Sequence, residues 1–245
     1  MTILLTLLLG ATSYTGIHAD GVQAYENENY PQAVEYFEEL VYNRVYEAEV
    51  FYNLGNTYFR LGEFPLAIVN YERALRIDPT LRVARENLQQ VVNQTQMKLP
   101  RPAPDGLEKS FYFWHSRLRA STSLSLVLLF WLLLWGGLIG RTLRPMRYLR
   151  RVSYACGVVA VVFWGSWLLK THPMELAVAQ GDSIPVRIGT KETDALRFEL
   201  FSGDRVHIDA VDGEQVRVLT ANGERGWVDA AYLIPVWPPE RGTGK

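Results

Sequence analysis

The chain has 245 residues, and its hydrophobic residues, 48% of the total, gather into blocks that polar stretches separate, which predicts several small modules. Its 25 basic and 26 acidic residues leave a formal net charge of -1, which offers no field to attract nucleic acid or an anionic surface. The single cysteine, Cys156, excludes an intrachain disulfide and a cysteine-based zinc site, and its apolar neighbours indicate a small hydrophobic side chain.

The N-terminal segment, residues 1–19, has the pattern of a secretory signal peptide. Residues 3–9 form an apolar h-region, small and polar residues follow, and Ala19 is a possible cleavage position. No Lys or Arg precedes the apolar run, and Ile17 is not small, so an uncleaved anchor and a different translation start are open alternatives. Sequence alone does not decide whether the segment is cleaved.

A repeated helix pair is predicted over residues 20–97. Residues 48–79 read AEVFYNLGNTYFRLGEFPLAIVNYERALRIDP. The positions that mark two packed helices are Phe51, Leu54, Gly55 and Tyr58, followed by Ala67, Tyr71, Ala74 and Pro79. This pattern resembles the tetratricopeptide repeat across its 34-residue period, with Gly55 and Ala67 small where the helices cross.

An internal comparison supports a second repeat. Subtracting 34 from Gly55, Pro65, Ala67 and Tyr71 gives Gly21, Pro31, Ala33 and Phe37. Residues 81–96 are then the opening helix of a third repeat that caps the array. Two and a half repeats form a thin core, so we expect this module to need a partner or the membrane surface for full stability.

The resemblance to tetratricopeptide proteins implies a protein-binding face, because such proteins bind extended peptides on the surface made by their first helices. The candidate residues on that face are Glu49, Tyr52, Asn53, Asn56, Phe59 and Arg60. The variant that clamps a peptide carboxylate has lysine where this chain has Tyr52, so the resemblance does not extend to that specificity. An equally weighted alternative is that Asn53 and Asn56 only stabilise contacts between helices.

Two uncharged stretches predict transmembrane helices at residues 119–140 and 152–170, after a Pro-rich linker and juxtamembrane segment at residues 98–118. The loop between them, residues 141–151, carries five arginines and no acid, which places it in the cytoplasm and both flanking regions outside. This predicts a multi-pass protein of the bacterial inner membrane with both soluble domains extracytoplasmic.

Small residues predict close packing within the transmembrane hairpin. Gly136 and Gly140 lie four residues apart at the cytoplasmic end of the first span, and Ser153 and Gly157 lie four apart at the same end of the second. An even alternative is that glycine is simply common in membrane helices.

A small antiparallel β module is predicted at residues 174–236, with strands at residues 206–208 and 216–218 and turn signals at Asp212-Gly213 and Asn222-Gly223. The motifs Gly226-Trp227-Val228, Ala231-Tyr232-Leu233 and Pro185-Val186-Arg187 resemble the bacterial SH3 domain. Residues 237–245 are predicted to be a disordered tail.

The SH3 resemblance implies a shallow groove for Pro-rich or cell-wall peptides. Its candidate residues are Phe198, Phe201, Trp227 and Tyr232. The match is partial, because Asp229 stands where eukaryotic grooves keep a proline and the tryptophan expected near Gln215 is missing. Trp227 is more often a barrel-packing residue than a ligand platform.

No phosphate-binding, dinucleotide, zinc-protease or serine-hydrolase motif is present, and the four histidines lie in different segments without the spacing of metal ligands. The sequence therefore predicts an interaction protein without a cofactor or metal, not an enzyme.

The order of the modules resembles the BatE family of the bacterial aerotolerance operon. That resemblance implies a scaffold beside von Willebrand A-domain membrane proteins and a MoxR-type ATPase in the stress tolerance of the envelope. An alternative is a tether that binds peptidoglycan peptides through the SH3-like module, and a third is an accessory subunit of an envelope enzyme. The ligands of both modules and the oligomeric state cannot be read from the sequence.

Overall fold

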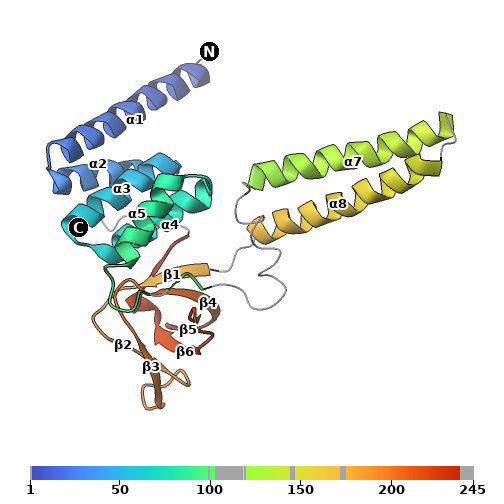
Figure 1. The fold of residues 1–245 in the computed structure, drawn as a ribbon. Coiled ribbons are helices and arrows are strands. Elements are labelled where there is room, and N and C mark those ends of the chain that lie inside the picture. Colours follow the sequence, from blue (N-terminus) through green and yellow to red (C-terminus); the bar gives the residue numbers. More distant parts are fainter. Residues whose placement is uncertain are drawn as a thin grey trace. The chain divides into compact units, whose positions relative to one another are not determined.

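The computed structural model describes residues 2–98, 100–102, 118, 120–143, 147–171 and 175–237 (Figure 1). The chain divides into two compact units. One combines Met1–Pro104 with Met174–Lys245, and the other is Asp105–Pro173. In sequence, the first unit thus consists of two segments, one before and one after the second unit. Most of the predicted linker, and the predicted tail beyond Trp237, lie outside the described residues.

The N-terminal part of the first unit is a row of antiparallel helices. They are α1 (Thr2–Glu26), α2 (Tyr30–Tyr42), α3 (Ala48–Leu61), α4 (Phe64–Ile77) and α5 (Arg82–Val92), and each packs against the next. Pro31 and Pro65 lie in the first turns of α2 and α4, where a missing backbone N–H costs little. Gly62 ends α3 with φ 80°, the left-handed conformation that favours glycine. The predicted helical repeats are confirmed.

In both repeats, the two helices cross at the equivalent position. A Cβ atom on Gly55 would lie 2.9 Å from the ring of Tyr71, and one on Gly21 would lie 2.9 Å from the ring of Phe37. Both ring residues are almost fully buried. The two Gly–aromatic contacts are one repeat apart in sequence, as the period predicts.

Helix α1 extends across the expected boundary between the signal-like segment and the repeats. It runs without interruption from Thr2 to Glu26, so the expected boundary between residues 19 and 20 falls inside a helix. Tyr14 and Ile17, which the sequence assigned to the signal-like segment, pack against the core of the repeats.

The C-terminal part of the first unit is an antiparallel sheet of seven strands in the order β3-β2-β6-β5-β4-β1-β7. The strands are β1 (Glu175–Ala179), β2 (Ile184–Arg187), β3 (Leu196–Leu200), β4 (Arg205–Asp212), β5 (Gln215–Leu219), β6 (Arg225–Asp229) and β7 (Leu233–Pro235). Among the described strands, the two outermost, β3 and β7, are not paired, so the sheet is not closed into a barrel.

The predicted strands and turns of this module are confirmed. Strands β4 and β5 form a hairpin in which Asp212 pairs with Gln215, and Gly213 adopts φ 61° between them. Gly223, with φ 82°, turns the chain from β5 to β6. Both positions need the left-handed conformation that glycine adopts without strain.

The second unit contains two long apolar helices, α7 (Ala120–Leu143) and α8 (Arg147–Thr171), which pack along each other. Ser121–Gly140 and Tyr148–Leu168 are long and apolar enough to cross a membrane. Most of the predicted loop, residues 141–151, is helical, and residues 144–146 lie outside the described part of the chain.

The packing of this hairpin differs from the prediction by one residue. A Cβ atom on Gly136 or Gly140 would meet nothing within 4 Å, whereas one on Gly137 would overlap Oγ of Ser153. Gly157 faces Leu134, so the second predicted pair does lie in the contact between the helices. The prediction for Gly136 and Gly140 was therefore wrong, because a step of one residue turns a helix position by about 100°.

Candidate functional site: the inner face of the repeats

Helices α1, α3 and α5 are the first helices of the successive repeats, and α3 contacts both of the others. We call the surface that they share the inner face. The candidate residues Tyr52, Asn53, Asn56 and Phe59 are partly exposed on α3, and Glu49 and Arg60 are exposed. All six therefore remain accessible from solvent, and they come from one helix with the spacing of one face.

Asn56 is the centre of a hydrogen-bond network on the inner face. Its Oδ1 accepts from the hydroxyl of Tyr71 at 2.7 Å and from Nδ2 of Asn87 at 2.9 Å. The hydroxyl of Tyr52 lies 3.5 Å from the same nitrogen of Asn87. Burial raises the pKa of Tyr71, so its hydroxyl remains a donor at physiological pH. Asn56 thus joins α3 to both α4 and α5.

Asn53 makes the corresponding connection towards α1. Its Nδ2 donates to Nε2 of His18 at 3.2 Å, and the His18 ring packs edge-on against Phe37 with centroids 5.8 Å apart. A cavity of about 30 Å³ lies beside it, lined by Val22, Tyr25, Phe37, Asn53 and Asn56. The amides that the sequence offered as binding residues or as helix contacts do make helix contacts, and they also line this small hollow.

The remaining inner-face residues are less constrained. The guanidinium of Arg60 lies over the ring of Tyr30 at 4.9 Å, and Phe59 packs beside Phe64 at 6.1 Å between ring centroids. Glu49 has an exposed side chain in the first turn of α3. These side chains can change partners on binding at little cost, since exposed side chains keep much of their rotamer freedom.

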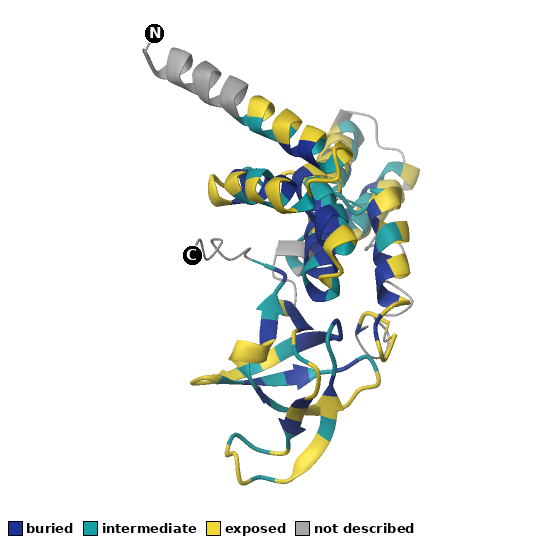
Figure 2. Cartoon of the chain, turned by 90° about the vertical axis from the view of Figure 1, so that its left-hand side faces the viewer, coloured by how far each residue is buried: buried dark blue, intermediate teal, exposed yellow. Residues whose placement is uncertain are grey.

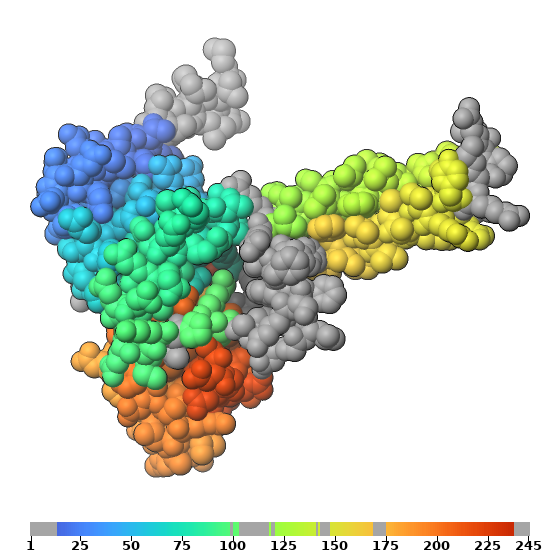
Figure 3. Space-filling model, viewed as in Figure 1, coloured from blue at the N-terminus to red at the C-terminus, as the bar shows by residue number. Residues whose placement is uncertain are grey.

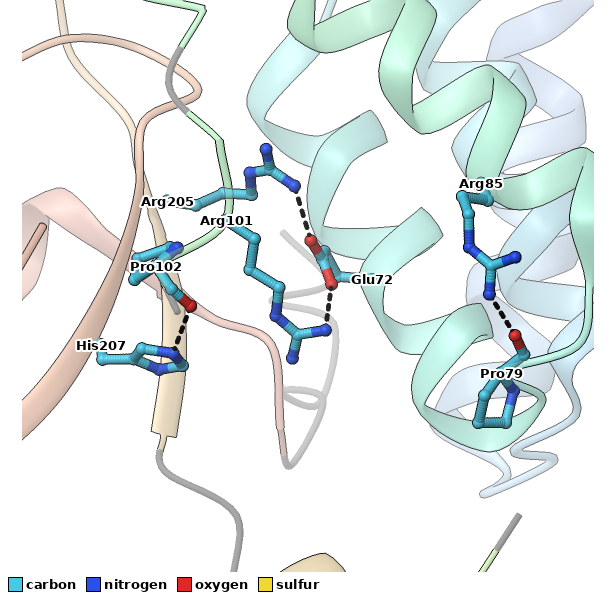
Figure 4. A network of polar contacts seen from close by, with 7 residues as sticks. All are labelled: Glu72, Pro79, Arg85, Arg101, Pro102, Arg205 and His207. Carbon is cyan, nitrogen blue, oxygen red and sulfur yellow. Dashed lines mark hydrogen bonds and ion pairs between the residues drawn. The ribbon is translucent and has the colours of Figure 1, made fainter. Parts of the chain in front are cut away.

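The opposite side of the repeats is covered by the β module. Glu72 on α4 has a side chain only 2% exposed and pairs with Arg205 of β4 at 3.0 Å (Figure 4). Arg101, in the segment after α5, approaches the other carboxylate oxygen at 3.5 Å. Two cations on one buried carboxylate satisfy both of its oxygens, which a buried charge requires.

Arg73, the next residue on α4, holds the end of the sheet. Its Nε donates to the carbonyl of Val236 at 2.9 Å and its Nη2 to that of Pro235 at 3.1 Å. Beyond them, the Trp237 ring lies 5.4 Å from that of Tyr46, and the Arg76 guanidinium lies over it at 5.1 Å. Trp237, which the sequence assigned to the tail, therefore belongs to this interface.

Apolar side chains make the interface continuous. Leu176, Val178 and Val236 of the β module belong to the same buried cluster as the repeat core. Figure 2 shows buried residues running from the helices into the neighbouring strands, and Figure 3 shows the surface of the strands, in orange and red, directly against the helices. The turn before β4 also fits closely, because a Cβ atom on Gly203 would lie 3.1 Å from Ile68 of α4.

Two titratable groups lie near this interface. Nε2 of His207 donates to the carbonyl of Pro102 at 3.1 Å, and burial, followed by the charge of Arg101, lowers the pKa of its ring. Asp204 accepts from the amide of Phe201 at 2.9 Å through Oδ2, and burial raises its pKa. A pKa that differs between the folded and the unfolded chain couples the protonation of each group to folding.

The four candidate groove residues of the β module lie apart. Gly226, next to Trp227 on β6, is buried, and its Cβ position is 3.6 Å from the Phe198 ring. Because neighbouring strand residues point to opposite faces, Trp227 and Phe198 face opposite sides of the sheet. Phe201 lies in the turn before β4, and Tyr232 lies in the short 3-10 helix before β7. No ring contact joins any two of the four within the described residues.

The interface residues were not found by sequence reasoning. Glu72, Arg73 and Arg205 are charged residues that look like ordinary surface positions until the partner segment is known. The alternation of Arg205 and His207 with Val206 in β4 is typical of a polar face exposed to solvent, yet both residues are buried, so this pattern carries no signal of the interface. Within the described residues, no cluster of His, Cys, Asp or Glu could hold a metal ion.

Comparison with known proteins supports the repeat assignment. The tetratricopeptide repeat family model matches residues 48–81, which cover α3 and α4. This repeat is in general a non-enzymatic module that mediates contacts between proteins. No curated protein matches the chain.

Proposed function

We propose that this protein is a membrane-anchored scaffold that binds an extended segment of a partner protein on its inner face. One observation carries the proposal. The β module covers the outer side of α4, while the aromatic, amide and charged side chains of α3 remain accessible on the inner face. The surface that tetratricopeptide repeats offer to partners is thus the one left open here.

The second unit anchors this scaffold in the bacterial inner membrane. Its helices expose large apolar side chains, such as Leu132 at 69% and Val158 at 65%. Such surface is unfavourable in water but compatible with lipid, where a helix also satisfies its own backbone hydrogen bonds.

Topology follows from the way the first unit is assembled. Segments before and after the two spans share the Glu72–Arg205 ion pair and one buried apolar cluster, so they belong on the same side of the membrane. An even number of spans meets that requirement. The five arginines of residues 141–151 orient the hairpin with its turn in the cytoplasm and the first unit outside.

The proposed setting is a Bat-type complex with von Willebrand A-domain membrane proteins and a MoxR-type ATPase system. It rests on the order of the modules. We assign the C-terminal sheet to the SH3-like class on its short antiparallel strands and on the Gly226-Trp227-Val228 motif in β6. In this chain the main role of the C-terminal sheet is to cover the outer side of the repeats.

Cross-linking in intact cells tests the proposal. The full chain, tagged after Lys245, is cross-linked, solubilised in mild detergent, and its co-purifying molecules are identified by mass spectrometry. A charge reversal at Arg60, Arg60→Glu, should lose the partner protein by at least about tenfold, because a charged contact contributes about 1.5–3 kcal/mol. Glu39→Lys, an exposed position on α2 away from the inner face, is the matched control.

The outcomes separate the candidate functions. A-domain membrane proteins that depend on Arg60 would support the Bat-type scaffold. If muropeptides co-purify in place of a protein partner, and Tyr232→Ala abolishes that co-purification, the protein is a wall tether and not a Bat-type scaffold. Alkaline phosphatase fused after Lys245 should be active, and an inactive fusion would contradict the orientation.

A further inference from the structure

The 34-residue period places the start of the first repeat at Tyr14, inside α1. The family match begins at Ala48, which is also the first residue of α3. One period of 34 residues earlier is position 14. The side chain of Tyr14 packs against the repeat core. The period therefore places the start of the first repeat at Tyr14, and the packing of Tyr14 shows that this residue is part of the folded repeat.

Residues 14–19 contribute directly to the repeat. Ile17 packs against the core, and His18 contacts Phe37 and accepts a hydrogen bond from Asn53 on the inner face. Cleavage after Ala19 would remove these contacts and leave only seven residues of α1, Asp20 to Glu26. The two remaining turns would keep the core contacts of Val22, Ala24 and Tyr25, but a helix this short depends on its packing and would be weakened by the loss of the others.

A second position in the signal-like segment fits a signal peptidase better. These enzymes need small side chains at the last and third-last positions before the cut. Ser13 and Ala11 meet that requirement four and two residues after the apolar run ends at Leu9. For a cut after Ala19, the third-last position would be Ile17, which is large and packs, partly buried, against the core.

We propose that the protein is processed between Ser13 and Tyr14. An envelope peptidase of the signal-peptidase class hydrolyses this peptide bond with one water molecule, leaving a carboxylate on Ser13 and an amino group on Tyr14. Cleavage acts on the extended chain during export, before α1 folds. The mature protein then begins with the first residue of its first repeat. This inference rests on the proposed location of the repeats outside the cytoplasm.

The test is the N-terminus of the full chain, tagged after Lys245, purified from membranes and analysed by intact mass and N-terminal sequencing. A chain that begins at Tyr14 is expected. A chain that begins at Asp20, or one that retains residues 1–13, overturns the proposal.

Two matched variants test the position of the cut. Ser13→Phe should block processing and add residues 1–13 to the purified chain. Ala19→Phe, at an exposed position of α1, should still yield a chain that begins at Tyr14. A chain lengthened by Ala19→Phe but not by Ser13→Phe would place the cut after residue 19 and overturn the proposal.

Protease added to spheroplasts separates this inference from the proposed location. If residues 1–13 are retained and the repeats are digested, the location stands and only the processing site is wrong. If residues 1–13 are retained and the repeats are protected from the protease, the proposed location of the repeats outside the cytoplasm is wrong as well.

Discussion

Glu72 of α4 and Arg205 of β4 are 133 residues apart in sequence and form an ion pair at 3.0 Å, with side chains only 2% and 7% exposed. The two long apolar helices, α7 and α8, lie between them in the chain. The pair is therefore a direct link between the two segments of the first unit, residues 1–104 and 174–245.

Removing one partner of this pair should be strongly destabilising. Arg205→Ala leaves the Glu72 carboxylate buried with the single, more distant Arg101, and we expect a loss of about 3–5 kcal/mol in the free energy of unfolding. Chemical denaturation of the full chain in detergent, followed by the fluorescence of Trp237 and Trp227, measures this loss. The control is Glu86→Ala, which breaks the exposed Arg82–Glu86 pair and should cost less than about 1 kcal/mol. Equal effects of both substitutions would contradict the buried role of Glu72.

His207 should make stability fall in mild acid. Its pKa in the folded protein is lower than 6.5, because burial, and then the positive charge of Arg101, disfavour the protonated ring. As the pH falls through about 6.5, the unfolded chain binds a proton that the folded chain does not, so the contribution of His207 is complete above that pH and is lost below it.

Thermal unfolding of wild type and His207→Gln at a series of pH values measures this contribution. The glutamine amide can still donate to Pro102, but it does not titrate, so the difference in melting temperature between the two proteins should change below about pH 6.5. Asp204 has a raised pKa and the opposite sign, and it cancels in this comparison because both proteins contain it. A difference that stays constant with pH would contradict the prediction.

Local features of the fold could be predicted because they depend on residues close in sequence. Gly55 and Tyr71 pack together within one repeat, and Gly213 turns a two-residue hairpin. The docking of the β module could not be predicted, since it depends on Glu72 and Arg205 meeting across residues 73–204. The sequence around Glu72 and Arg205 does not distinguish them from charged residues that are exposed to solvent.

The candidate site was predicted in part for the same reason. The spacing of Tyr52, Asn53 and Asn56 places them on one helix face, and the structure shows that face accessible. Their hydrogen-bond partners, His18 and Asn87, come from neighbouring repeats and needed the packing of α1 and α5. Whether the four candidate groove residues of the β module lie together depends on the register of the sheet, which the patterns of short strands do not specify.

Gly55→Ala should destabilise the repeats. The new Cβ would lie 2.9 Å from the Tyr71 ring, which is fully buried and hydrogen-bonded to Asn56, so it cannot move freely. Overpacking of this kind costs about 1–3 kcal/mol. Hydrogen exchange of the full chain should show faster exchange in α3 and α4, whereas Glu49→Ala, on the exposed side of α3, should change stability by no more than about 0.5 kcal/mol. Unchanged protection in Gly55→Ala would show that the helices do not cross at this residue.

The contact between the long apolar helices α7 and α8 offers a comparison between adjacent residues. A side chain on Gly137 would overlap Oγ of Ser153 on α8, whereas one on Gly136 would meet nothing within 4 Å. Gly137→Leu should therefore separate α7 from α8 and cost at least about 1 kcal/mol, while Gly136→Leu should be tolerated.

The unfolding of both variants in detergent, followed by the loss of helical structure with increasing denaturant, measures the difference. Both substitutions add the same apolar surface and replace the same residue type, so a general effect of leucine on a membrane helix cancels between them. Greater destabilisation by Gly136→Leu would mean that α7 is rotated about its axis relative to the structure, because one residue corresponds to about 100°.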